Sequence, residues 1–320
     1  MMMPFWALIA DSFREALDRK IFWVMLCISI LVAAAMFCVS FEGTADGSIE
    51  ELNVFFGAYR VRLSEAAPGT VIPRETIIGG VVYLVMDHVL GGIGILLALI
   101  ATGSFFPSFL ERGAIDLALS KSLSRPLLFL AKYLGSMAFV LVQATVFVGL
   151  TFLVVGFRWG MWMPGYLLVI PLMVLLFSYL YCVSAWVAVR TRSTLAAVLV
   201  SLGAWVVFVG LQGLGDVFEL MPQWKENRTL YTVARVAGWV VPKTQDITYF
   251  AGRWSGAPAP ADVMPKTRVP TPADRELIDK AGEVDRQRFE QRALPSIGSS
   301  LLFEAVVVAA AMWTFSRRDY

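Results

Sequence analysis

Six long apolar stretches constrain this chain more than any other feature of its sequence. The first, IFWVMLCISILVAAAMFCVSF at residues 21–41, contains no charged side chain. A helix needs about 20 mainly apolar residues to cross a bilayer. Charged residues are only 16% of the chain, whereas soluble proteins average roughly 25%. We therefore predict an all-α polytopic membrane protein with six transmembrane helices, at about 21–41, 88–106, 128–155, 165–189, 193–214 and 297–315.

The distribution of Lys and Arg predicts the orientation of these spans. If the N-terminus lies inside, the inner segments are 1–20, 104–132, 190–194 and 316–320, and they hold eleven Lys and Arg. The short outer loops, 42–76 and 157–164, hold four. Short cytoplasmic loops carry the excess of positive charge in membrane proteins. Both termini are therefore expected in the cytoplasm.

Residues 1–20 form a charged leader before the first span. Trp6, Ile9, Phe13 and Leu17 recur at helical spacing, which predicts an amphipathic helix on the inner membrane surface. A plain cytoplasmic extension of the first span also fits this pattern. A cleaved signal peptide fits less well, because the leader carries three acidic residues and the apolar run is too long.

The segments predicted outside the membrane differ in character. Residues 42–76 are acidic, and the apolar residues 77–87 suggest an interfacial or re-entrant piece before the second span. The 215–296 loop is too long for a simple connection, so we expect an extracytoplasmic insertion between the fifth and sixth spans. A proline-rich linker at 258–272 precedes a polar stretch, about 272–293, with helical spacing.

Catalytic and metal-binding motifs are missing from the sequence. No G-x-x-x-x-G-K-[ST] phosphate loop occurs, so this chain is not expected to bind ATP through such a loop, and no cofactor is expected on it. Cys27, Cys38 and Cys182 lie singly in apolar runs, as small packing residues do. A basic patch with interleaved aromatic residues is also absent, which argues against nucleic-acid binding. The chain is therefore not expected to be an enzyme.

Three ionisable residues fall in or beside predicted spans. Asp87 and the single histidine, His88, sit at the predicted outer start of the second span, and Glu304 lies in the sixth. Ionisable groups inside a membrane are costly and often functional. Asp87 and His88 fit either a proton relay or a simple interfacial pair. Glu304 fits a position facing a central cavity, a position at the interface, or a contact with another span.

Small residues and one lysine carry further expectations about packing. Gly91, Gly92 and Gly94 in the second span, with Gly210 and Gly213 in the fifth, permit close approach of helices. Lys132 lies one turn inside the third span, where its side chain can extend to the membrane interface.

The charged segment between the second and third spans is the most informative part of the sequence. Pro107 suits the first turn of a helix, and Ser124 can cap the helix that becomes the third span. We predict a cytoplasmic helix at 107–122 that mixes apolar and charged positions. Such a helix can dock into a groove on a soluble partner. A solvated surface helix with no partner fits the same pattern.

This segment resembles the membrane subunits of ABC-2-type exporters. The resemblance rests on Glu111, Gly113, 115–117, 119–120, 124–125 and the Lys132-Tyr133-x-Gly135 run, and VPKTQDI at 241–247 resembles an outer-loop piece of one bacterial branch. Ser122 departs from it, because many relatives have proline there. The resemblance implies a coupling helix at 107–122 that docks on a separate cytoplasmic ATPase. The residues that it implies for ATPase coupling are Leu110, Glu111, Arg112, Gly113, Asp116 and Leu117.

The resemblance implies the permease of an ATP-driven exporter that pairs with a second permease subunit, identical or different, among membrane lipids. The alternative is an ATPase-coupled envelope assembly or mechanotransmission subunit that transports no substrate. A proton-coupled carrier using Asp87, His88 and Glu304 is a third hypothesis. Few fixed charges in the spans mildly favour an amphipathic or lipid-like substrate.

Overall fold

A computed structural model of the chain contains six helical segments long and apolar enough to cross a membrane. The structure describes residues 14, 17, 20–43, 49–62, 73–111, 115, 124–220, 228–257, 279–280, 282–284, 286–287, 290 and 293–318. The leader at 1–20 therefore lies almost wholly outside the described residues. The six segments are Lys20–Phe37, Arg74–Phe109, Arg125–Trp159, Pro164–Thr191, Thr194–Gly215 and Ala293–Arg317. The all-α polytopic fold is thus confirmed.

The first span is helix α2 (Lys20–Phe37), and a small antiparallel sheet follows it directly. Strands β1 (Val39–Gly43), β2 (Ile49–Val54) and β3 (Tyr59–Arg62) pair in chain order. Alternating apolar residues in VSFEG and IEELNV suit such pairing. No strand was predicted in this acidic segment, and the first span ends at Phe37, four residues before its predicted end at residue 41.

The second span is a longer helical run than the sequence predicted. It comprises α4 (Arg74–Leu84), the π-helix η1 (Val85–Gly94), α5 (Ile95–Thr102) and α6 (Phe105–Phe109). Residues 77–87, expected as an interfacial or re-entrant piece, are not a separate element, since α4 continues into η1 without a break. Asp87 and His88 consequently lie inside this helical run rather than at its start.

The remaining spans agree closely with the predicted ones. Helix α8 (Arg125–Trp159) is the third and ends at Gly160, whose φ of 67° suits the left-handed cap of a helix. The short helix η2 (Pro164–Leu168) leads into α9 (Val169–Thr191), and α10 (Thr194–Leu220) follows after a tight turn. Helix α15 (Ala293–Arg317) is the sixth span.

The predicted outer insertion between α10 and α15 begins with two helices. They are the amphipathic α11 (Arg228–Val240) and α12 (Thr244–Ser255). Residues 279–280, 282–284, 286–287 and 290 are helical, in the stretch where a polar helix was predicted. The proline-rich linker lies outside the described residues.

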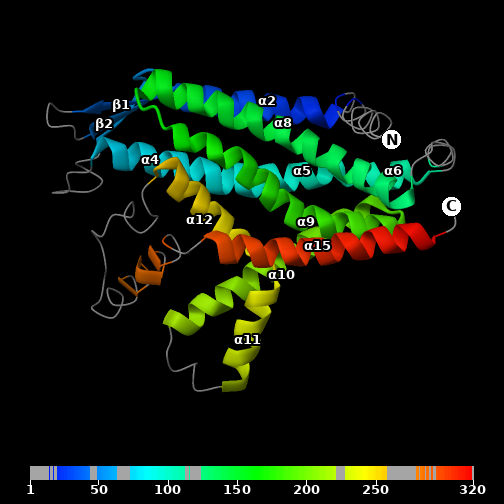
Figure 1. Ribbon diagram of the computed structural model, residues 1–320. Coiled ribbons are helices and arrows are strands. Elements are labelled where there is room, and N and C mark those ends of the chain that lie inside the picture. Colours follow the sequence, from blue (N-terminus) through cyan, green and yellow to red (C-terminus); the bar gives the residue numbers. More distant parts are fainter. Residues whose placement is uncertain are drawn as a thin grey trace.

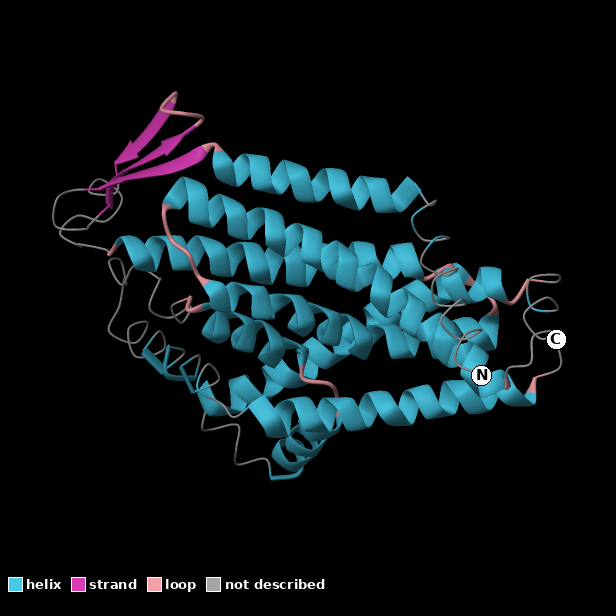
Figure 2. Ribbon diagram, turned by 45° about the horizontal axis from the view of Figure 1, so that its top comes forward, coloured by secondary structure: helices cyan, strands magenta, loops and turns pink. Residues whose placement is uncertain are grey.

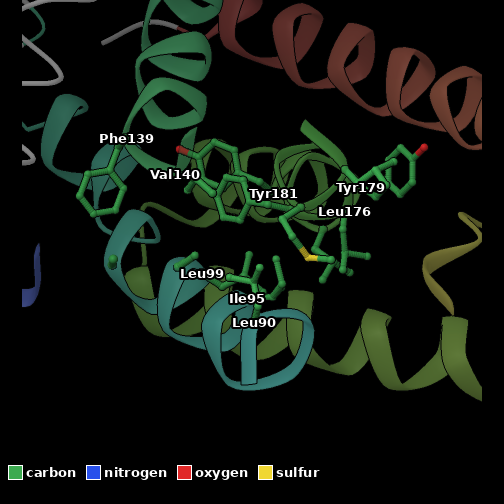
Figure 3. Packing of buried hydrophobic residues seen from close by; sticks show 14 of the residues in the cluster. Leu90, Ile95, Leu99, Phe139, Val140, Leu176, Tyr179 and Tyr181 are labelled. Atoms are coloured by element: carbon green, nitrogen blue, oxygen red, sulfur yellow. The ribbon is translucent and has the colours of Figure 1, made fainter. Parts of the chain in front are cut away.

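Helix α9 is the centre of the bundle. Its neighbours are α8, α10, α15, α5 and α12, and its side chains include Leu176, Tyr179 and Tyr181, all buried. Figure 3 shows Tyr181 among these residues, with Phe139 of α8 on one side and Leu176 and Tyr179 on the other. By contrast, α2, α10 and α15 lie at the perimeter and expose large apolar side chains. The buried hydrophobic cluster therefore surrounds α9.

Different elements lie at the two ends of the bundle (Figures 1 and 2). The α6 end carries α6, the start of α2 and the end of α15, and the sheet end carries the three strands. At the sheet end, Arg158 donates a hydrogen bond to the carbonyl of Phe37, and Trp159 donates one to that of Val39. The start of α2 and the end of α15 thus lie at the same end of the bundle.

Candidate functional site

The α6 end is held together by arginine side chains that donate to backbone carbonyls. Nη1 of Arg125, at the start of α8, lies 3.1 Å from the carbonyl of Ser316 and 2.8 Å from that of Arg318. The Arg318 guanidinium donates at 2.6 and 2.7 Å to the carbonyls of Val189 and Arg190. These bonds satisfy carbonyls left free at the ends of α9 and α15. The ends of three spans therefore form one unit.

Helix α6 is anchored in this unit by aromatic contacts. The rings of Phe109 and Phe315 stack with centroids 6.3 Å apart. Leu110 follows the helix and is only 3% exposed, so it is part of the hydrophobic core. Glu111 is exposed and can meet a partner. The helix as described ends at Phe109, and the amide of Ile115, also buried, donates a hydrogen bond to the Glu111 carbonyl.

The other predicted coupling residues lie outside the described residues. These are Arg112, Gly113, Asp116 and Leu117. Pro107 lies in the first turn of α6 as expected, and Ser124 occupies the N-cap position of α8 without a side-chain capping bond. Leu110 thus packs the end of α6 into the core of this chain, and its role in ATPase coupling stays a prediction.

Lys132 does not extend to the interface, contrary to the prediction. It is 7% exposed, and its ammonium group lies 5.8 Å and 5.6 Å from the ring centroids of Phe105 and Phe109. Aromatic faces attract a cation within about 6 Å. The lysine therefore connects α8 to α6 through cation–π contacts inside the bundle.

Glu304 contacts two other spans near the middle of α15. Its Oε1 accepts a hydrogen bond of 2.8 Å from the Tyr133 hydroxyl, and its Oε2 accepts one of 2.8 Å from the Ser178 hydroxyl. Tyr133 belongs to α8 and Ser178 to α9, so one carboxylate joins three helices. Of the positions that the sequence left open for Glu304, the structure selects the contact with other spans.

Asp87 and His88 project from the π-helix η1. Asp87 Oδ2 lies 3.4 Å from His88 Nδ1, and the two side chains are 32% and 70% exposed. Asp87 lines a cavity of about 160 Å³ between η1, α9, α10 and α12. Gly91 also lines it, and a Cβ there would lie 3.3 Å from a methyl carbon of Thr248 on α12. The expected close approach at Gly91 is thus present.

The close approach expected at Gly210 and Gly213 is not seen, because nothing within the described chain lies within 4 Å of a Cβ built at either residue. Both glycines lie on α10 at the perimeter. Their small size therefore serves no contact within the described residues.

The VPKTQDI segment forms a buried polar junction that sequence reasoning missed. Gln212 of α10 donates to the Pro242 carbonyl at 3.1 Å and to the Thr244 hydroxyl at 3.3 Å, and it accepts from the Gln245 amide at 3.1 Å. Asp246 accepts a 2.6 Å bond from Ser296 of α15. The segment therefore joins α10, α12 and α15. Its resemblance to relatives was the only sequence signal for it.

Comparison with known proteins places the chain in a family. A search of curated proteins found no match. The family model described as ABC-2 family transporter protein matches residues 6–320, which is nearly the whole chain and includes all six spans. The predicted resemblance is thereby confirmed. This multi-pass membrane protein belongs to the ABC-2 transporter family.

Proposed function

We propose that the chain is the permease subunit of an ATP-driven exporter in the bacterial cytoplasmic membrane. Members of this family are membrane transport components and normally work with a cytoplasmic ATPase. The permease provides the translocation path, and a separate subunit binds and hydrolyses ATP. The ATPase docks at the α6 end, on the connection between α6 and α8.

The charge of the α6 end is the observation that carries this proposal. Among the described residues, the end holds one acid, Glu111, and a set of basic residues: Lys20, Arg125, Arg190, Arg192, Arg317 and Arg318. Excess Lys and Arg marks the cytoplasmic side of a membrane protein. An ATPase that docks there reaches a unit that already holds the ends of α8, α9 and α15. Movement of α6 would therefore be passed to several spans at once.

A second permease subunit completes the translocation path. Helices α2, α10 and α15 expose large apolar side chains, including Leu31, Val206 and Leu302. These faces contact either the second subunit or membrane lipid, because apolar helix surfaces in a bilayer are covered by one or the other. The partner is a copy of this chain or a related chain.

Charge reversal tests the docking position. The double variant Glu111→Lys, Arg112→Glu is expected to reduce co-purification with the cytoplasmic ATPase partner about tenfold, because charged contacts at an interface contribute roughly 1.5–3 kcal/mol. A matched reversal at the sheet end, Glu42→Lys with Arg60→Glu, should leave co-purification unchanged. Equal co-purification and equal ATPase stimulation for both double variants would overturn the docking position.

The alternative function, mechanotransmission without a substrate, is favoured by one observation at the sheet end. Phe55, Phe56 and Tyr59 are more than 60% exposed at the tip of the β2–β3 hairpin, where they can contact an envelope partner. Proteoliposomes that contain the permease and its ATPase distinguish the two functions. ATP-dependent movement of a fluorescent lipid or amphipathic dye supports export. ATP hydrolysis that depends on the permease, with no movement of such compounds, supports mechanotransmission.

A further inference from the structure

The cavity beside Asp87 forms where the helical run of the second span changes geometry. Helix η1 is a π-helix of ten residues, whereas π-turns are rare, usually single, and frequent at functional sites. Gly91 and Gly92 lie in this stretch and present only backbone to the cavity. A space of about 160 Å³ therefore remains between η1 and the helices opposite it.

One charged side chain lines this cavity. Among the lining residues only Asp87 is ionisable, and it lies thirteen positions into the Arg74–Phe109 span. A carboxylate within a membrane span is costly and is usually paired. The neighbouring His88 does not line the cavity and is 70% exposed. The cavity therefore has a negatively charged wall with space for a positively charged group.

The opposite walls combine an aromatic ring with apolar side chains and hydroxyl groups. Trp205 and Val209 of α10 and Leu176 of α9 form the apolar part. Thr244 and Thr248 of α12 supply hydroxyl groups, and Thr248 donates at 2.9 Å to the Gln245 carbonyl. A carboxylate and a tryptophan together suit an ammonium group. The carboxylate carries the opposite charge, and the face of an indole ring attracts a cation.

We propose that this cavity binds an ammonium group, carried by a small organic amine or by the headgroup of a lipid. Ca²⁺ or Mg²⁺ fits less well, because each takes six or more oxygen ligands and Trp205, Val209 and Leu176 offer none. A neutral apolar ligand would contact Trp205, Val209 and Leu176 but would leave the half-buried Asp87 carboxylate with only the exposed His88, 3.4 Å away, as a partner. The charge of an ammonium group would pair with Asp87, and its attached carbon atoms would contact Trp205, Val209 and Leu176.

Equilibrium dialysis tests this site on the full-length protein in nanodiscs of phosphatidylglycerol, which has no ammonium group. The probes are radiolabelled tetramethylammonium and ethylammonium. We expect saturable binding of at least one probe. Asp87→Asn should weaken it about tenfold or more, as expected for loss of a charged partner. Trp205→Leu should weaken it about 2- to 30-fold, the range for cation–π contacts.

Matched substitutions elsewhere in the bundle serve as controls. Glu304→Gln removes a carboxylate that does not line the cavity, and Trp186→Leu removes another tryptophan; neither should change binding. If Asp87→Asn does not fold, Val209→Phe fills the cavity without removing the charge and should abolish binding. Absence of saturable binding overturns the proposal. The proposal is also overturned if the control variants lose as much probe binding as Asp87→Asn and Trp205→Leu. Competition by sodium that is as strong as competition by the amines would overturn it too.

Changing the lipid of the nanodisc distinguishes the two sources of the ammonium group. If nanodiscs of phosphatidylethanolamine or phosphatidylcholine prevent probe binding, a lipid headgroup occupies the site. If they do not, the ligand is a soluble amine. Both outcomes support the site. The measurement uses neither ATP nor an ATPase, so its failure leaves the proposed exporter function untouched, and failure of ATPase docking leaves this site untouched.

Discussion

Single polar side chains connect spans that are far apart in the sequence. Tyr133 and Glu304 are separated by 171 positions, yet the Tyr133 hydroxyl lies 2.8 Å from the Glu304 carboxylate. Hydrogen bonds between transmembrane helices contribute about 0.6 kcal/mol on average, and bonds to charged groups about 1.5–3 kcal/mol. Lys132, one residue before Tyr133, packs on Phe105 and Phe109. Two adjacent positions in α8 thus contact two different helices.

A double-mutant cycle measures the Tyr133–Glu304 contact. Tyr133→Phe and Glu304→Gln are each expected to lower the free energy of unfolding by about 1 kcal/mol, because each weakens the same bond. The double variant should lose less than the sum of the two single variants. Unfolding in detergent, followed by circular dichroism, gives the values. Strict additivity would show that the two side chains do not interact.

At the scale of elements, close backbone contacts place the outer helices. Gly165 of η2 lies directly against the Trp254 carbonyl of α12, so that a Cβ at residue 165 would overlap this oxygen. Gly91 also brings η1 close to α12, since a Cβ at residue 91 would lie 3.3 Å from a methyl carbon of Thr248. Together with the Gln212 junction, these contacts fix α12 against the sheet-end half of the bundle. The cavity beside Asp87 exists because α12 is held there.

Alanine substitution tests the contact between η2 and α12. Gly165→Ala is expected to lower the unfolding temperature in detergent by several degrees, because the added methyl group forces η2 away from α12. The matched control is Gly149→Ala in α8, where nothing lies within 4 Å of the new Cβ. Alanine favours a helix interior over glycine by up to about 1 kcal/mol, so the control should be neutral or stabilising. Equal effects at both sites would contradict the contact.

At the scale of the whole molecule, the two ends of the bundle differ in charge and structure. The described ends of α2 and α15 that adjoin the chain termini lie at the basic α6 end, and the sheet and α12 lie at the other. Helix α8, with 35 residues, measures roughly 50 Å, longer than the hydrocarbon core of about 30 Å. The bundle therefore extends beyond the bilayer, where an ATPase or an envelope partner can reach it.

Cysteine labelling tests the orientation that follows from this charge difference. In a background with Cys27, Cys38 and Cys182 replaced by alanine, single cysteines are introduced as Tyr59→Cys in β3 and Thr191→Cys at the end of α9. A membrane-impermeant maleimide added to intact spheroplasts should label residue 59 and not residue 191. After the membrane is permeabilised, both should react. The reverse pattern would place the α6 end outside.

The sequence alone determined the number of spans, the helical class and the family. Each span is a continuous apolar run, and the bilayer requires such runs to be helical, so local composition decides the result. The motif from Glu111 to Gly135 was sufficient for the family resemblance. The strands at 39–62 were not predicted because VSFEG is only five residues long and contains a glutamate. It forms a strand only when IEELNV pairs with it.

Only the tertiary structure decided which polar residues meet. The sequence identified Asp87 and Glu304 as unusual, but their partners come from other helices: Glu304 meets Tyr133 and Ser178, and Asp87 shares a cavity with Trp205. It also decided that Leu110 is buried and that Lys132 points inward. Local periodicity specifies a helix and its apolar residues. Which neighbour a residue meets depends on the packing of six helices, whose contacts are distant in sequence.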